Sequence, residues 1–235
     1  MSLNGSPAPR ARRLGLIVLM LGAVCIGIMP NAAKLAYGEG VSPLGLLVLR
    51  SAIGAIGLAL FLWARREKLL VPRKLVPKTA AAGVALLMAA GGGMGAVAYI
   101  DVTVASVIFF TYPIFVAVVN HVRGTTRLSL AEIILIALAF VGVALALGLR
   151  RESLDQLNYT GLGLALLSSV GITTVILTTT ATTAALGTVR ANLHMNLWGV
   201  VYFIALALAL PALGLAGESV YPQSAFAWLY VLIAA

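Results

Sequence analysis

The sequence is divided into apolar runs of about 20 residues separated by short charged segments, and the run at Val102–Val122 constrains the fold most. Its 21 residues contain no acidic or basic side chain except His121 near the end. As an α-helix rising about 1.5 Å per residue, such a run is long enough to cross a hydrocarbon core about 30 Å thick. The run therefore predicts a membrane-spanning helix.

A proline at the centre of this run, Pro113, predicts that the helix is kinked. Proline donates no backbone hydrogen bond, and its ring pushes away the carbonyl four residues earlier, here that of Phe109. In lipid, a freed carbonyl needs a neighbouring helix, a hydroxyl or water in a cavity. Thr111 brings a hydroxyl close by, Tyr112 precedes the proline, and Asp101 stands where the run begins. The stretch is therefore either one wall of a substrate path or a kinked helix that serves packing alone.

The composition places these runs in a membrane. Hydrophobic residues make up 61% of the 235 residues and charged residues 10%, and the mean hydropathy is +1.06. A soluble domain averages about 45–50% apolar and about 25% charged residues. The net charge of +9 comes from basic residues in short loops rather than from one basic face, which argues against nucleic-acid binding. The predicted fold class is all-α: a polytopic transmembrane helix bundle.

The other apolar runs predict the rest of the bundle. The first follows a polar segment at residues 1–13 and resembles a signal peptide, but it has no clear cleavage site and predicts an uncleaved helix that Pro30 bends or ends. The turn Tyr99–Asp101 is so short that the third and fourth spans must be antiparallel neighbours. About seven to eight spans are expected; besides Val102–Val122 they are Leu14–Asn31, Leu44–Trp63, Thr79–Ala98, Leu130–Leu149, Leu162–Ala185, Leu193–Leu213 and the start of an eighth at Ala225–Ala235.

The distribution of basic residues predicts an amino terminus in the cytoplasm. Short loops rich in Lys and Arg stay on the cytoplasmic side. With that orientation, Lys34, Arg150 and Arg151 are the basic residues of the outer loops, and Arg50 lies within a span. Twelve of the 16 Lys and Arg residues then lie inside: Arg10, Arg12, Arg13, Arg65, Arg66, Lys68, Arg73, Lys74, Lys78, Arg123, Arg127 and Arg190. The protein is expected to be a multi-pass protein of the cell membrane, that is, the inner or plasma membrane.

Charged groups at membrane depth are candidate binding or coupling groups. Arg50 lies about two turns inside the second span, where a charge costs at least about 2.5–3.5 kcal/mol unless it snorkels. It either fixes the helices by snorkelling or by pairing with Asp101, or it anchors a substrate carboxylate or phosphate. Asp101 either carries a coupling proton or caps the amides of Thr103 or Val104.

The sixth span is unusually rich in threonine, with seven threonines between Thr173 and Thr183. Threonine hydroxyls can bond the carbonyls of their own helix or those of a neighbour, and a stripe facing a watery cavity would look the same. Thr173 and Thr174 are the candidates for such a cavity. In the third span, Gly91 and Gly95 have the spacing of a close helix contact, with tight packing favoured over a hinge.

A faint internal repeat is visible. Five spans end near Leu149, and a shift of 146 residues pairs Leu21 with Leu167 and Arg50 with Asn196. Because five is odd, a second copy would be inverted relative to the first. Inverted repeats are the architecture of many secondary transporters, with the site near the midplane between the halves.

The run AYIDVTVASVIFFTYPIFVAVVN, the basic loop after it and the closing FVGVALALG resemble the EamA domain, the repeat unit of the drug/metabolite transporter superfamily. Pro43 followed by Leu49-Arg50 also resembles that family's second helix. The likeness covers residues 14–149 well and 161–235 loosely. Where members commonly carry a glutamate after the fourth helix, this chain reads Gly124-Thr125-Thr126-Arg127, which weakens any claim about an ion pair at that end.

The resemblance implies two inverted five-helix repeats, ten helices in all, and both termini inside. It divides the chain into a cytoplasmic tail at residues 1–13, a first repeat at 14–149 and a partial second repeat at 157–235, with about 60 residues of the second repeat expected to be missing. The chain is then either a fragment or a degenerate short member. A second copy of the chain, or the missing C-terminal helices, are the partners that would complete it.

Two classes of function remain. The first is a secondary transporter that moves a small organic metabolite, amino acid or drug by alternating access. The second is a non-transporting scaffold or inactive fragment, with a membrane enzyme less favoured because His121 and His194 are isolated and no HExxH, CxxC or Walker glycine loop occurs. No catalytic residue, metal or cofactor is expected; the expected partners are a small-molecule solute and membrane lipid. The cavity or coupling candidates are Arg50, Asp101, Thr111, Tyr112, Pro113, Thr173 and Thr174.

Overall fold

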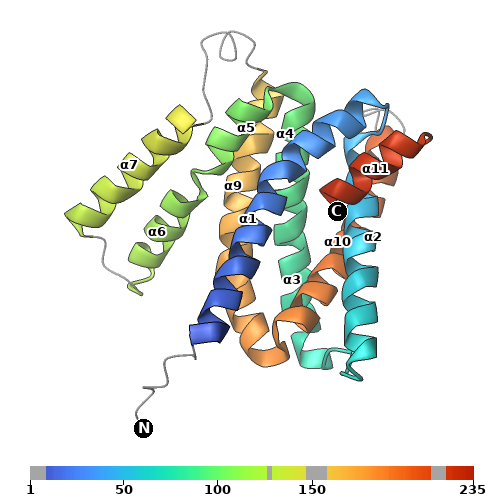
Figure 1. Ribbon diagram of the computed structural model, residues 1–235, viewed down its shortest axis with the longest axis horizontal. Coiled ribbons are helices and arrows are strands. Elements are labelled where there is room, and N and C mark those ends of the chain that lie inside the picture. The colour runs from blue at the N-terminus through green and yellow to red at the C-terminus, as the bar shows by residue number, and fades with distance from the viewer. Residues whose placement is uncertain (1–8, 126–128, 147–157, 213–220) are drawn as a thin grey trace.

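The computed structural model describes residues 9–125, 129–146, 158–212 and 221–235, and all regular structure within these ranges is helical (Figure 1). Six of the helical segments are long and apolar enough to cross a membrane. This agrees with the predicted all-α polytopic bundle. The elements are α1 (Pro9–Gly38), α2 (Pro43–Ala64), η1 (Arg73–Leu75), α3 (Val76–Leu86), η2 (Leu87–Gly91), α4 (Gly92–Tyr99), α5 (Val102–Phe109), α6 (Tyr112–Val122), α7 (Leu130–Ala146), α9 (Tyr159–Leu186), α10 (Thr188–Ala212) and α11 (Ala225–Ala234).

Helix α1 differs at both ends from its predicted span. It starts at Pro9, inside the segment expected to be a tail, and it continues through Pro30 to Gly38. Of the two predicted effects of Pro30, bending or ending the helix, the second is therefore wrong. The extension brings Lys34 and Tyr37 within reach of the carboxyl-terminal half of the third span, where α4 accepts hydrogen bonds from both side chains.

The third span is one helical rod with an irregular centre. The short 3₁₀ turn η1 leads into α3, then into the π-helical segment η2, then into α4. Such π-segments are rare insertions that disturb the regular ladder of backbone hydrogen bonds. Ile100 is extended and Asp101 begins α5, so the third and fourth spans are joined by the short turn that the sequence predicts.

The later elements have nearly the expected bounds. Helix α9 extends three residues before the predicted start, and α10 starts at Thr188 rather than Leu193, directly after the left-handed Gly187. The described part of the predicted fifth span is α7, of 17 residues, and the rest of that span lies outside the described residues. Helix α11 has 10 residues and is apolar but shorter than a span.

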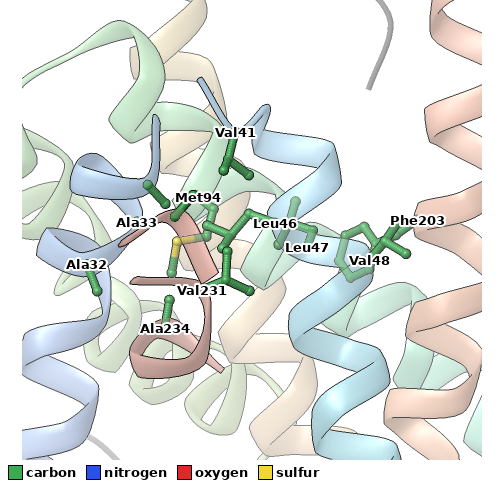
Figure 2. Close-up of a cluster of buried hydrophobic side chains, with 12 residues drawn as sticks. Ala32, Ala33, Val41, Leu46, Leu47, Val48, Met94, Phe203, Val231 and Ala234 are labelled. Carbon is green, nitrogen blue, oxygen red and sulfur yellow. The ribbon is translucent and has the colours of Figure 1, made fainter. Parts of the chain in front are cut away.

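The buried core joins helices far apart in the sequence. Helix α2 packs along α10, α9 packs on the third span, and α11 packs on α1 (Figure 1). Figure 2 shows one buried cluster in which residues of α1, α2, α4, α10 and α11 meet. Its fully covered members include Leu46, Phe203 and Val231. The small residues Ala32, Ala33 and Ala234 allow α1 and α11 to approach within this cluster.

Candidate functional site

The fourth span is broken into two helices at the place where the sequence predicts a kink. Helix α5 ends at Phe109, Phe110 and Thr111 lie between the helices, and α6 starts at Tyr112 with Pro113 in its first turn. Proline is well tolerated in a first helical turn because the amide there has no intrahelical partner. The break therefore leaves carbonyls at the end of α5 that need donors from elsewhere.

Two hydroxyls supply those donors. Thr111 Oγ1 donates to the carbonyl oxygen of Ile108 at 2.7 Å. Ser169 Oγ, on α9, lies 2.7 Å from the carbonyl oxygen of Ile108 and 2.9 Å from that of Phe109. The carbonyl oxygen of Ile108 also accepts the backbone amide of Thr111 at 3.0 Å. Because the hydroxyl of Ser169 has one proton, the arrangement that satisfies both carbonyls has Ser169 donating to Phe109. The carbonyl that Pro113 frees is thus capped by a neighbouring helix, as predicted.

Thr173 extends this contact by one helical turn. Its hydroxyl is 2.8 Å from the carbonyl oxygen of Ser169 and 3.4 Å from that of Tyr112, at the start of α6. The hydroxyls of Thr111 and Ser169 are 3.0 Å apart. We call the set Thr111, Ser169 and Thr173, with the carbonyls of Ile108, Phe109 and Tyr112, the hydroxyl seam. It brings Thr111, Tyr112, Pro113 and Thr173 together, four of the seven candidates.

A second buried contact ties α9 to the π-segment of the third span. Ser168 Oγ donates to the carbonyl oxygen of Ala89 at 2.6 Å. A Cβ atom placed on Gly171 would lie 2.3 Å from the backbone nitrogen of Ala89, and one on Gly92 would lie 2.5 Å from the carbonyl oxygen of Leu164. A close backbone approach therefore exists in this glycine cluster, but it lies at Gly92. The predicted pair, Gly91 and Gly95, meets only side-chain atoms at 3.3 Å or more.

The remaining candidates lie apart from the hydroxyl seam. Thr174 bonds the carbonyl oxygen of Val170 in its own helix at 2.9 Å. Asp101 accepts a hydrogen bond from the backbone amide of Thr103 at 2.8 Å, which is the capping role considered from the sequence. Arg50 Nε donates to the carbonyl oxygen of Ala234 at 3.1 Å, so the pairing with Asp101 is not the contact observed.

Sequence reasoning missed two of the most buried polar groups, Ser168 and Ser169, which are 1% and 0% exposed. They lie in the segment LLSSVG between aliphatic residues. The available signal was two adjacent serines one turn before the Thr173-Thr174 pair, on the same helix and at the spacing of one face.

The hydroxyl seam is uncharged, so its chemistry is hydrogen bonding to neutral or polar groups. A search of the described residues finds no group of three His, Cys, Asp or Glu side chains that could hold a metal ion. Ser51, on the α2 face toward α10, is 1% exposed and its hydroxyl has no hydrogen-bond partner within the described part of the chain. Its Oγ lies 3.5 Å from where a Cβ of Gly199 would be, which places a second polar group at a helix contact.

Comparison with known proteins gives one family. Residues 13–148, more than half of the chain, match the EamA-like transporter family. No curated protein matches the chain. The matched region includes α1 to α7 and therefore one side of the hydroxyl seam, while Ser169 and Thr173 lie beyond it.

Proposed function

The chain belongs to the EamA-like transporter family, and we propose that it is a secondary transporter that moves a small organic metabolite, amino acid or drug across the cell membrane by alternating access. The coarse part of this statement, a multi-pass membrane protein of a transporter family, follows from the family match and the apolar helices. The proposal assigns no catalytic role to any residue.

One observation carries the proposal beyond the family: the interrupted fourth span. Non-helical backbone at membrane depth is tolerated only where protein or a water-filled cavity satisfies it. Broken helices of this kind commonly mark the site in secondary transporters, at the interface between the two halves. Here the break in the first half of the chain meets α9, which follows it by about 50 residues. The seam therefore has the position that a site between two halves requires.

We place the solute next to this break, with Thr111, Tyr112 and Thr173 as groups that exchange their present partners for the solute. The single hydroxyl proton of Ser169 already has two carbonyls within reach, so a small change in the angle between α5 and α6 would redistribute these bonds at low cost. Arg50 is the candidate anchor for a solute carboxylate or phosphate. We assign the amino terminus to the cytoplasm because short loops rich in Lys and Arg stay on the cytoplasmic side.

Flux through vesicles tests the proposal. The full-length gene product is reconstituted, and uptake of a panel of labelled amino acids and organic anions is compared with uptake by protein-free vesicles. Thr173→Val removes a hydroxyl that is proposed to bond the solute during transport. Loss of one hydrogen bond of about 1.4 kcal/mol in the rate-limiting step should reduce flux about tenfold. Thr180→Val, on the same helix and exposed, is the matched control and should leave flux unchanged.

Arg50→Ala and Asp101→Asn separate the remaining roles. Asparagine is as good an N-cap as aspartate, so Asp101→Asn keeps the cap on Thr103 but removes the charge. Unchanged flux in this variant would assign Asp101 to capping alone, and a loss would assign it to coupling. Unchanged flux in Arg50→Ala would remove the proposed anchor. Absence of flux above protein-free vesicles for the whole panel would favour the non-transporting scaffold.

A further inference from the structure

One end of the bundle carries a strongly basic surface that the proposed transport does not use. Residues 65–78, which connect α2 to α3, contain six basic residues and one acidic residue, Glu67. The basic side chains of this stretch are all exposed. Arg190, in the first turn of α10, adds a seventh. We call this set the basic face: Arg65, Arg66, Lys68, Arg73, Lys74, Lys78 and Arg190.

The contacts of its neighbours hold the start of α10, and with it Arg190, at the α2–α3 connection. His194, one turn after Arg190 on the same face of α10, donates from Nε2 to the carbonyl oxygen of Leu69 at 2.8 Å. On the other side, Leu62 at the end of α2 packs in one buried cluster with Leu193, and Val189 contacts this cluster. Figure 1 shows the α2–α3 connection and the start of α10 at the same end of the bundle.

The guanidinium of Arg190 is not fully satisfied by the residues that the structure describes. Its Nε atom is buried and has no hydrogen-bond partner among the residues described. The backbone amide of Ala191 bonds the carbonyl oxygen of Gly187, so the amides of Thr188 to Arg190 belong to the open first turn of α10. A helix amino terminus attracts anions because its free amides and its dipole are positive. A partly buried cation whose Nε has no partner among the described residues strengthens that preference.

Exposed apolar side chains lie within the same surface. Trp63, in the last turn of α2, is 71% exposed, and Leu70, in the connection, is 83% exposed. Arg65 lies over the ring of Phe61, with 5.0 Å from its guanidinium carbon to the ring centroid. Tryptophan at the end of a span marks the membrane–water boundary. A surface with arginines at the membrane–water boundary and an exposed leucine beside them matches a lipid, which has both an anionic headgroup and apolar chains. A soluble anion would contact only the basic residues.

We propose that the basic face binds the phosphate headgroup of anionic phospholipids, with the guanidinium of Arg190 and the residues of the connection around the phosphate and with Trp63 and Leu70 against the acyl chains. Clusters of four to eight basic residues next to a span attract anionic lipid, at about fivefold in affinity for each residue near the surface. The site depends on no assumption about the transported solute.

Quenching of Trp63 by brominated lipid tests this site. The full-length chain with Trp198→Phe and Trp228→Phe retains Trp63 as its reporter and is placed in phosphatidylcholine vesicles containing brominated phosphatidylglycerol. We expect phosphatidylglycerol to be enriched several-fold over phosphatidylcholine at Trp63. The matched reporter is Trp228 of α11, with the other two tryptophans replaced by Phe. It lies near Glu39 rather than near the basic face, because Ser224 at the start of its helix donates to Glu39 at 3.0 Å, and it should show no enrichment.

Two charge variants move the result in opposite directions. Arg190→Gln should weaken the preference for phosphatidylglycerol about fivefold, and Glu67→Gln should strengthen it by a similar factor. Because Glu67 is exposed, its variant keeps the test valid if Arg190→Gln does not fold. Equal quenching by brominated phosphatidylcholine and phosphatidylglycerol would overturn the proposal. A preference for phosphatidylglycerol that inorganic phosphate removes, but sodium chloride of equal ionic strength does not, would also overturn the proposal. That result would indicate a site for soluble anions.

Discussion

The two halves of α9 carry the same kind of side chain and use it differently. In the first half, the hydroxyls of Ser168 and Ser169 reach carbonyls of the third and fourth spans. Thr173 stands between the two kinds, because its hydroxyl is 2.8 Å from the carbonyl oxygen of Ser169 in its own helix and 3.4 Å from that of Tyr112. In the second half, every threonine hydroxyl bonds a carbonyl three or four residues earlier in α9 itself; these residues are Thr174, Thr178, Thr179, Thr180, Thr182 and Thr183.

The difference follows from the helices that face each half. The first half lies opposite the π-segment Leu87–Gly91 and the break before Pro113, where the regular ladder is disturbed and carbonyls need donors. The second half lies toward α3, since α9 runs antiparallel to the third span with Gly161 at Ile100 and Gly171 at Ala89. A regular helix such as α3 uses its own carbonyls. On α9, the hydroxyls that reach another helix therefore face irregular backbone. The rule does not extend to tyrosine, since the hydroxyls of Tyr37 and Tyr202 reach carbonyls of the regular helices α4 and α3.

The largest expected effect comes from filling the closest contact of the first half. Gly171→Ala would place its Cβ 2.3 Å from the backbone nitrogen of Ala89 and 2.6 Å from the backbone carbon of Met88. Neither atom can move without shifting the π-segment, so we expect a loss of at least about 3 kcal/mol in the free energy of unfolding. Thermal unfolding of the purified chain in detergent measures it.

Gly163→Ala is the control for this variant. The same helix and the same substitution are involved, but no heavy atom lies within 4 Å of its added Cβ. Alanine is the better helix former by about 1 kcal/mol, so the control should be neutral or slightly stabilising. Equal unfolding temperatures for Gly171→Ala and Gly163→Ala would mean that the first half of α9 is not the close-packed half.

A smaller effect should follow from removing the hydroxyl that caps the break. Ser169→Ala leaves the carbonyl of Phe109 without its donor, and we expect a cost of about 1–2 kcal/mol in the free energy of unfolding. In a Pro113→Ala background, residue 113 regains an amide that can bond the same carbonyl. The cost of Ser169→Ala should then fall by at least about half. Unfolding of the two single variants and the double variant measures the coupling, and strictly additive effects would contradict the assignment of Ser169 to that carbonyl.

The sequence predicts the features that depend on neighbouring residues and misses those that depend on residues far apart in the chain. The break at Pro113, the freed carbonyl of Phe109 and the need for a hydroxyl follow from local geometry, and the structure confirms them. The donor Ser169 lies 60 residues away, and nothing in the pattern LLSSVGITT indicates which face of α9 meets α5. The extent of α1 also depends on contacts distant in sequence. A proline within an apolar helix is tolerated when neighbouring helices hold it, and beyond Pro30 the side chains of Lys34 and Tyr37 bond α4.

The candidate site residues show the same difference between local and distant information. Thr111, Tyr112, Pro113 and Thr173 meet because three of them flank one break and the fourth faces it. Arg50 and Asp101 were considered as a pair because both lie at similar depth, but depth does not fix the angular position of a residue around its helix. Asp101 instead accepts a hydrogen bond from a free backbone amide in the first turn of α5, that of Thr103.

The smallest expected effect on stability belongs to the second half of α9, and it decides what those threonines do. Thr180 is exposed and bonds the carbonyl oxygen of Ile176 at 3.0 Å, a carbonyl that its own helix can also satisfy. Thr180→Val keeps the shape and removes the hydroxyl, so the free energy of unfolding should change by less than about 0.5 kcal/mol. Solute flux is then measured with the same preparation of Thr180→Val. An unchanged rate would leave the hydroxyl seam as the polar contact that serves transport. A lower rate at unchanged stability would mean that the self-bonded threonines turn toward the solute during the cycle, and the contrast between the two halves of α9 would then describe only the resting state.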